Sequence, residues 1–149
     1  MITNTSFYVN YFEIDKLNIV YHACYAHWFE LGRMDYLNKA GFPNSSITLK
    51  GVCLPLSQIE CSYKSPAKYG DEVSVLTSIV YMSCVKLKFA YKVLNRKTGK
   101  VLAVGSTVHA WTDNQIRPVN IEKTAPEIYN LLKASAEKAS NNEEKKAAT

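Results

Sequence analysis

The sequence predicts an α+β fold in which an antiparallel sheet surrounds one long buried helix. Two observations carry this prediction. The segment from Ala23 to Ala40 is apolar nearly all round at helical spacing, which is typical of a buried helix. The later part of the chain holds consecutive strand-like segments joined by short turns, and such strands pair antiparallel. The sheet must then cover the single long helix.

Each element is indicated by its own residues. Alternation from Val73 to Ile79 predicts a strand with one buried face, and the run from Arg96 to Gly99 predicts a hairpin turn. Gly41 is placed to cap the long helix, and Pro43 stops it. The predicted strands are Phe7–Ile14, Leu54–Tyr63, Glu72–Tyr81, Val85–Asn95 and Lys100–Thr112. A loop is predicted over Phe42–Gly51 and a short amphipathic helix over Pro126–Ala136.

Length and composition indicate a single globular domain. The chain has 149 residues, of which 47% are hydrophobic. We expect one domain over residues 1–137 and a frayed or disordered tail over residues 138–149, because that tail has no large apolar residue. The sequence has neither an apolar run long enough to span a membrane nor a signal-peptide pattern, so we expect a cytoplasmic protein without a membrane partner.

The four cysteines, Cys24, Cys53, Cys61 and Cys84, are scattered through apolar segments. They form no Cys-x-x-Cys pair, and no histidine has metal-like spacing with an acid or a thiol. The pattern predicts buried free thiols rather than a disulfide framework or a metal site.

The formal net charge of +5 allows several interpretations. A basic surface can hold nucleic acid or a small polyanion such as a nucleotide-bearing cofactor, and it can also be ordinary surface charge. The sequence has no RNA-recognition aromatic pattern, helix-turn-helix signal or zinc knuckle. We therefore expect no nucleic-acid partner.

The segment from Asp15 to Tyr25 holds the strongest chemical signal. Asp15 ends a strand-like run, a short loop follows in which Asn18 can take a positive φ, and an aromatic-rich helix starts near His22 or Ala23. This order aims a carboxylate and the free N–H groups of a helix N-terminus at one small volume. A carboxylate can attack or deprotonate, and such N–H groups stabilise an oxyanion. By position alone, Asp15 also fits a solvated loop or capping residue.

Two blocks of sequence resemble a known family. The first reads Asp15-x-x-Asn18-Ile19-Val20-Tyr21-His22-x-x-Tyr25 and continues with Trp28-Phe29-Glu30-x-x-Arg33. The second reads Tyr63-x-x-Pro66-Ala67-x-Tyr69-x-Asp71, and Arg117-Pro118 adds a weaker likeness. Together they resemble the hot-dog-fold acyl-CoA thioesterases, and in particular the 4-hydroxybenzoyl-CoA thioesterase-like branch. The resemblance covers residues 7 to 120, approximately.

The resemblance implies a hot-dog fold, an assembly and a reaction. In this family a sheet wraps one helix, subunits dimerise edge to edge, and dimers often form tetramers, so we expect a homodimer and beyond it a homotetramer. Members hydrolyse acyl-CoA thioesters without a metal or bound cofactor, at sites between subunits. The family's catalytic aspartate falls on Asp15, as nucleophile or general base. The backbone N–H that polarises the thioester carbonyl falls near His22, whose imidazole is a second candidate.

The resemblance also implies substrate contacts. Those expected beside the acyl group are Val20, Tyr21, Tyr25 and Trp28, with core packing as the alternative for Tyr25 and Trp28. The basic residues expected to hold the coenzyme are Lys64, Lys86 and Arg117, with solvated surface charge as the alternative for each.

The chain departs from the family pattern at three positions. Asn18 stands where glycine is usual, and Asn tolerates the left-handed region next best. Ser83 and Lys86 stand where relatives often place Arg and Ser.

On the long helix, Glu30 and Arg33 are three residues apart and are expected to form a structural ion pair.

Three other functions fit the same sequence. An acyl-carrier-protein thioesterase would use the same chemistry, and a basic surface suits an acidic carrier protein. A hydratase or dehydratase on the same fold would leave the thioester intact. A non-catalytic module would bind an acyl-CoA or a nucleotide without turnover.

Overall fold

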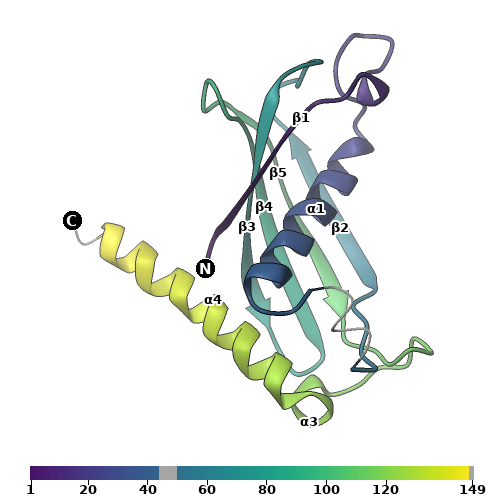
Figure 1. Cartoon of the computed structure of the whole chain (residues 1–149), viewed down its shortest axis with the longest axis vertical. Helices are drawn as coiled ribbons and strands as arrows, with labels where there is room; N and C mark the ends of the chain where they lie inside the picture. The colour runs from purple at the N-terminus through teal and green to yellow at the C-terminus, as the bar shows by residue number, and fades with distance from the viewer. Residues whose placement is uncertain (44–49, 148–149) are drawn as a thin grey trace.

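The computed structural model describes residues 1–43 and 50–147, with side chains to residue 137. This part of the chain forms one five-stranded sheet, a long helix across one face of it, and a second long helix that leaves the sheet at one end (Figure 1). The strands are β1 (Thr3–Tyr8), β2 (Leu56–Tyr63), β3 (Glu72–Met82), β4 (Lys86–Asn95) and β5 (Val101–Ala110). The helical elements are the 3-10 turn η1 (Tyr11–Glu13), α1 (Cys24–Lys39), α3 (Ile121–Thr124) and α4 (Pro126–Ala147).

The strands lie in the order β1-β3-β4-β5-β2, and each neighbouring pair is antiparallel. Short turns join β3 to β4 and β4 to β5, and Gly99 takes a φ of 72° in the second of them. The predicted antiparallel sheet and its hairpin turn are confirmed. Strands β1 and β2 form the two edges, so each has one side without a strand partner in the described chain.

Helix α1 packs on the sheet through its aromatic face. The ring of Phe29 stacks on Tyr91 with centroids 4.4 Å apart and planes 6° apart. Gly32 lets the helix approach β3, because a Cβ there would overlap the side chains of Val75 and Thr77. Truncating a buried aromatic such as Phe29 to alanine costs about 3–5 kcal/mol in other proteins. This packing sets the distance between α1 and the sheet.

The side of α1 that faces away from the sheet carries exposed side chains within the described part of the chain. His27 and Glu30 are exposed, and Met34 is 40% exposed. One sheet contacts only one side of a helix, so the all-round burial expected from the sequence holds here for the sheet side alone.

Two elements differ from the sequence prediction by more than two residues at an end. The first strand is Thr3–Tyr8 rather than Phe7–Ile14, because the Asn10 N–H donates to Glu13 Oε1 at 2.9 Å and closes a 3-10 turn. Helix α4 runs to Ala147 rather than ending at Ala136, since the segment after Ala136 is rich in Ala, Glu and Lys, which are strong helix formers. Of the predicted loop Phe42–Gly51, residues 44–49 lie outside the described part. The domain over 1–137 with a frayed tail over 138–149 stays a prediction.

All four cysteines are free, as predicted, and each is half-buried rather than fully buried. Within residues 1–43 and 50–137, no three His, Cys, Asp or Glu side chains gather where a metal ion could be held. None of the described helices combines the length and the apolar character that a membrane span requires.

Candidate active site

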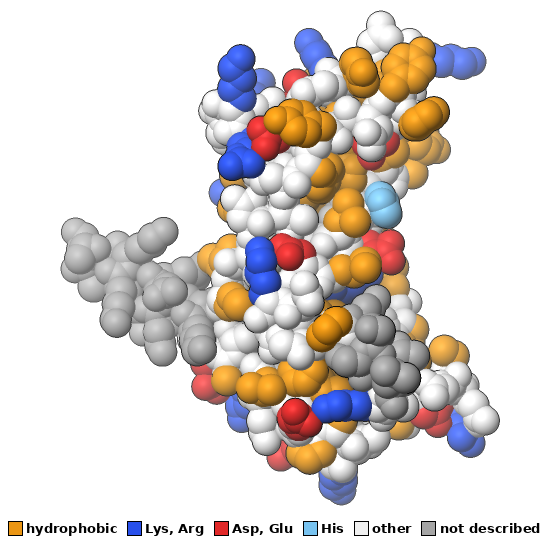
Figure 2. Space-filling view, in the orientation of Figure 1, with side chains coloured by type: hydrophobic (Ala, Val, Ile, Leu, Met, Phe, Trp, Pro, Cys, Tyr) orange, Lys and Arg blue, Asp and Glu red, His pale blue; other side chains and the backbone are white. Residues whose placement is uncertain are grey.

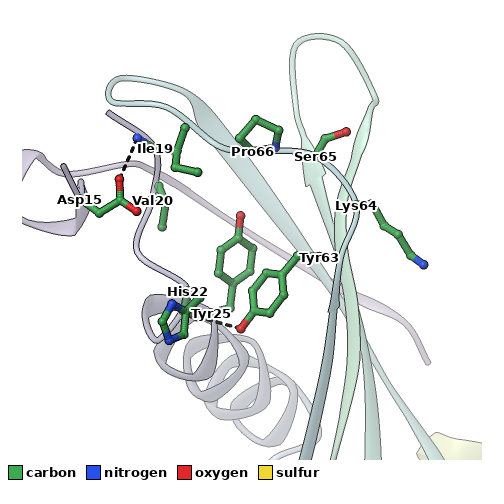
Figure 3. A pocket seen from close by; sticks show the side chains of 9 residues that line it. All are labelled: Asp15, Ile19, Val20, His22, Tyr25, Tyr63, Lys64, Ser65 and Pro66. Atoms are coloured by element: carbon green, nitrogen blue, oxygen red, sulfur yellow. Dashed lines mark hydrogen bonds between the residues drawn. The ribbon is translucent and has the colours of Figure 1, made fainter. Parts of the chain in front are cut away.

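The loop between η1 and α1 places Asp15 beside a pocket. The pocket holds about 360 Å³ and lies between the start of α1 and the end of β2 (Figure 3). Its lining consists of Asp15, Ile19, Val20, His22, Tyr25, Tyr63, Lys64, Ser65 and Pro66. The residues that the sequence predicts and the structure brings together here are Asp15, Val20, His22, Tyr25 and Lys64.

The turn from Asp15 to Ile19 is closed by its own backbone. The Asp15 N–H donates to the Ile19 carbonyl at 2.8 Å, and the Asn18 N–H donates to the Asp15 carbonyl at 3.1 Å. Asn18 has a φ of 60°, as the sequence predicts, in a region that Asn tolerates better than most residues. Oδ1 of Asp15 accepts from the N–H groups of Leu17 at 2.7 Å and Ile19 at 3.4 Å. The turn therefore orients the carboxylate.

The other carboxylate oxygen of Asp15, Oδ2, has no hydrogen-bond donor among the described residues, and Asp15 forms no ion pair with them. A carboxylate with one oxygen anchored by amides and one unengaged is both oriented and available. Its free oxygen can attack a carbonyl carbon or take a proton from water.

The residues just before α1 carry backbone donors beside the same pocket, which His22 lines. The N–H groups of His22 and Ala23 find no acceptor within the part of the chain that the structure describes, as is usual at a helix N-terminus. The carbonyl of His22 accepts from the Tyr63 hydroxyl at 3.0 Å, which ties the helix start to the end of β2 (Figure 3). Donors at the positive end of a helix dipole suit a developing oxyanion.

Glu13 joins the Asp15–Ile19 turn to α1, and sequence reasoning missed it. Its Oε2 accepts from Trp28 Nε1 at 2.7 Å, and its carbonyl accepts from the Tyr21 N–H at 2.7 Å. The Val20 N–H in turn donates to the Ala67 carbonyl at 2.9 Å. The available signal was an acidic residue two positions before Asp15 in an aromatic run.

Comparison with known proteins identifies the family. The family described as the thioesterase-like superfamily matches residues 6–139. The chain belongs to this superfamily. YneP of Bacillus subtilis, named as an acyl-CoA thioesterase, is 33% identical over 122 residues, which are 81% of this chain and 88% of YneP. The chloroplast acyl-acyl carrier protein thioesterase ATL3 of Arabidopsis thaliana is 26% identical over 110 residues, 74% of this chain and 58% of ATL3.

Solved structures agree with this assignment. The DHNA-CoA thioesterase of Staphylococcus aureus is 29% identical and superposes with a TM-score of 0.86, covering 95% of this chain and 94% of that protein. A hypothetical protein of Thermus thermophilus, TT1821, is 32% identical with a TM-score of 0.83, covering 91% of this chain and 98% of its own. The predicted hot-dog fold, an α+β arrangement, is confirmed.

This member of the thioesterase-like superfamily keeps some predicted residues outside the pocket. Trp28 is 1% exposed and packs below the site, which is the core-packing alternative. Tyr21 is 47% exposed beside His22. Lys86 pairs with Ala110 at the end of the sheet opposite to Tyr63. These three side chains do not line the cavity that contains Asp15.

Arg117 lies in the loop after β5, where its Nε donates to Asp113 Oδ2 at 3.0 Å. Within one chain, neither Arg117 nor Lys86 reaches the pocket, so their coenzyme roles stay predictions. Tyr63 and Pro66 do line it, although sequence reasoning did not name them as site residues. The available signal was their place in the second sequence block that resembles the family.

The two tyrosines of the pocket are held as neutral phenols. Burial raises the pKa of Tyr25 to about 12. Burial also raises the pKa of Tyr63 to about 12, with the nearby Cys61 thiol contributing. Both hydroxyls therefore stay protonated at neutral pH, where they serve as hydrogen-bond donors rather than as bases. Asp15 and the exposed His22 imidazole are the remaining candidates for proton transfer at this pocket.

Proposed function

We propose that this chain hydrolyses acyl-CoA thioesters and that Asp15 is the catalytic carboxylate. The observation that carries the proposal is one pocket that combines a carboxylate, anchored through one oxygen and free at the other, with unpaired N–H groups at the start of α1. Membership in the thioesterase-like superfamily and similarity to YneP supply the reaction class.

Two routes use this geometry. In the first, Oδ2 of Asp15 attacks the thioester carbonyl, the carbon–sulfur bond breaks, CoA leaves as a thiolate, and water hydrolyses the mixed anhydride. In the second, Asp15 takes a proton from the attacking water, and the tetrahedral intermediate expels the CoA thiolate. An acylated Asp15 peptide, detected by mass spectrometry after rapid quenching of a single turnover, supports the first route. Its absence in a productive turnover supports the second.

Both routes place negative charge on the carbonyl oxygen, and the N–H groups of His22 and Ala23 are the donors that we assign to it. One such donor contributes roughly 3 kcal/mol of transition-state stabilisation in a comparable enzyme. The His22 imidazole is exposed, tilts against the Tyr21 ring at 4.4 Å, and has no hydrogen bond to Asp15. We therefore assign His22 its role through the backbone and expect His22→Ala to be mild.

The surroundings of the pocket suit a substrate that is apolar at one end and anionic at the other. Phe12 is 97% exposed and Leu17 is 76% exposed in the segments before and after Asp15. Figure 2 shows hydrophobic side chains at this end of the molecule with Lys or Arg side chains around them. The exposed cations beside Asp15 in the sequence and after β2 are Lys16, Lys64 and Lys68. We assign Lys64, which lines the pocket, to the coenzyme, and Val20 and Tyr25 to the acyl group.

Acyl-carrier protein is the alternative thioester carrier, because the chain is also similar to ATL3. A hydrolysis screen with a thiol reagent, over short, medium, long and aromatic acyl-CoAs and matched acyl-carrier proteins, tests both. Free thiol from acyl-CoAs supports our proposal. Release only from carrier proteins favours the alternative. Binding of CoA esters without thiol release favours a non-catalytic module, and hydration of an enoyl-CoA favours a hydratase.

We also propose that the working unit is a homodimer joined along β2. This strand is an edge strand, and its apolar Leu56, Ile59 and Tyr63 are 51%, 42% and 51% exposed. A long exposed edge with apolar side chains is a ready template for another strand. Sedimentation of the wild type and of Ile59→Lys tests this proposal: a dimer that the lysine converts to monomer supports it, and a wild-type monomer contradicts it. A tetramer stays a prediction.

A further inference from the structure

A second cavity lies at the far end of the seam between α1 and β2. It holds about 180 Å³ and is lined by Glu30, Arg33, Met34, Leu37 and Leu54. Leu54 comes just before β2, whereas the Asp15 pocket includes Tyr63, the last residue of that strand. The two cavities therefore lie at opposite ends of one seam. Figure 1 shows α1 and β2 running along this flank.

A stripe of residues along α1 connects the two cavities. His22, Ala26, Glu30, Arg33 and Leu37 recur at spacings of three or four, so they share one side of the helix. His22 lines the first cavity, and the last three residues line the second. Ala26 is exposed between them and has a small side chain, so it adds little bulk to this side of the helix. At about 1.5 Å per residue, His22 and Arg33 are roughly 16 Å apart along the axis, a length that suits a medium-chain acyl group.

Arg33 is a half-buried cation without a carboxylate partner among the described residues. Its Nη1 donates to the Tyr91 hydroxyl at 3.2 Å. Glu30, the partner expected from the sequence, lies instead with Oε2 3.6 Å from His27 Nδ1, so the predicted Glu30–Arg33 ion pair is wrong. A guanidinium has five N–H donors, and the bond to Tyr91 uses only one.

A buried chain of hydrogen bonds holds Arg33 in place. The Tyr91 hydroxyl lies 2.6 Å from Thr107 Oγ1, which lies 2.9 Å from His109 Nε2, and His109 Nδ1 lies 3.1 Å from the Leu54 carbonyl. A carbonyl only accepts, so we assign the proton to Nδ1, and each hydroxyl then donates toward His109 while Tyr91 accepts from Arg33. Burial lowers the pKa of His109 to about 4, and the Arg33 charge adds to this effect. The chain keeps this direction at neutral pH.

We propose that Arg33 and Glu30 bind a hydroxyl group at the far end of the acyl chain, so that ω-hydroxyacyl thioesters are preferred over unsubstituted ones of equal length. A hydroxyl can accept from Arg33 and donate to Glu30, which line the same cavity. A terminal carboxylate pairs with Arg33 but is repelled by Glu30, and a methyl group satisfies neither. The inference rests on the proposed function, because the thioester must lie at Asp15.

The direct test compares kcat/KM for ω-hydroxydecanoyl-CoA and decanoyl-CoA. We expect the hydroxylated substrate to be favoured by about tenfold or more, as for a hydrogen bond to a charged group. Arg33→Met should bring this ratio close to one. Lys39→Met is the matched control, because Lys39 lies on the same helix and pairs with Asp35 at 2.9 Å on the other flank. It should leave the ratio unchanged.

Two further measurements keep the test decisive. Glu30→Gln keeps an acceptor oxygen and removes the charge, so it should raise kcat/KM for the ω-carboxy substrate relative to decanoyl-CoA. If Arg33→Met does not fold, Arg33→Lys and Glu30→Ala are measured in its place. Each should lower the ratio of kcat/KM for ω-hydroxydecanoyl-CoA to kcat/KM for decanoyl-CoA.

Binding of the two substrates to Asp15→Asn separates this inference from the proposed function. A tighter Kd for the hydroxylated substrate that Arg33→Met abolishes supports the site even if neither substrate is hydrolysed, in which case the proposed function alone fails. Equal Kd and equal kcat/KM for both substrates would overturn the inference. An Arg33→Met variant that changes the oligomeric state and leaves the ratio intact would also overturn it, because Arg33 would then serve a subunit contact.

Discussion

The turns Asp15–Ile19 and Asp113–Arg117 have the same backbone geometry but treat their carboxylates differently. In each, the N–H of the first residue donates to the carbonyl of the fifth, at 2.8 and 2.9 Å, and the fourth N–H donates to the first carbonyl at 3.1 Å. The fourth residues, Asn18 and Ile116, have φ values of 60° and 62°. In both turns, Oδ1 of the aspartate accepts from the third and fifth N–H groups.

The difference is the second carboxylate oxygen. Oδ2 of Asp113 accepts from Arg117 Nε at 3.0 Å, whereas Ile19 occupies the corresponding position in the first turn and leaves Oδ2 of Asp15 without a partner in the described chain. The first turn also leads into the start of α1, where His22 lines the same pocket and its N–H has no acceptor within the described chain. Turns with the same hydrogen bonds can therefore differ in role. The residue at the fifth position decides whether the carboxylate is paired, and the place of the turn in the fold decides whether it lies at a pocket.

The largest expected effect comes from removing each carboxylate in turn. Asp15→Asn should lower kcat by roughly 10²- to 10⁴-fold, the usual range for a general base. Asp113→Asn alters an equivalent turn far from the pocket, so it should leave kcat unchanged and lower Tm slightly. Thiol release and circular dichroism measure the two effects. Full turnover in folded Asp15→Asn would refute the assignment of Asp15.

The comparison can be sharpened by moving the arginine. Ile19→Arg places a guanidinium at the position that Arg117 occupies in the other turn, where it should pair with Oδ2 of Asp15. We expect kcat to fall about tenfold, because a paired carboxylate is a weaker base and nucleophile. Ile19→Met, which changes the pocket without adding a charge, is the control for shape. Equal losses in the two variants would show that the second oxygen is not the deciding feature.

A smaller effect should follow from exchanging the left-handed residues. Asn tolerates a positive φ, whereas a β-branched residue there is strained by roughly 1–2 kcal/mol. Asn18→Ile should therefore lower the free energy of unfolding by about that amount, and Ile116→Asn should raise it. Urea denaturation of both variants measures the pair. A stabilising Asn18→Ile would mean that the turn does not impose its φ on this residue.

The smallest effect concerns pH. The Arg117 backbone N–H is the largest cause that lowers the pKa of Asp113 below its ordinary value of 3.8, with Gln115 and the guanidinium adding to it. A lowered folded-state pKa stabilises the protein above pH 3.8, and this contribution is lost as the pH falls through the folded-state pKa. Asp113→Asn should flatten the decline of Tm in this acidic range. An unchanged decline would place the proton uptake at other groups.

The strands and the first turn could be predicted because local chemistry determines them. Alternation in β3 matches burial from Val75 to Ile79, where Leu76 and Ser78 are half-buried, although Ser74 on the same face as these two is buried. In the first turn, the positive φ of Asn18 could be predicted because asparagine tolerates this region better than most residues. The second turn could not be predicted, because Ile116 takes the same φ against its intrinsic preference.

The parts of the site that the sequence did not predict depend on long-range packing. Tyr63 and His22 are 41 positions apart and meet only because β2 lies beside the start of α1. Arg33 reaches Tyr91 across the helix–sheet interface, 58 positions away, rather than the local Glu30. Spacing on a helix shows which side chains can meet, but the tertiary structure decides which of them do.

The hydroxyl of Tyr63 has a consequence for regulation. It donates to the carbonyl of His22, just before α1 begins. Tyr63 is also the last residue of β2, whose outer side has no strand partner in the described chain. A strand added to that edge would restrain this tyrosine and, through it, the N–H groups to which we assign the oxyanion. Specific activity should therefore climb with protein concentration and level off once self-association is complete, so that dilution alone would switch the enzyme down.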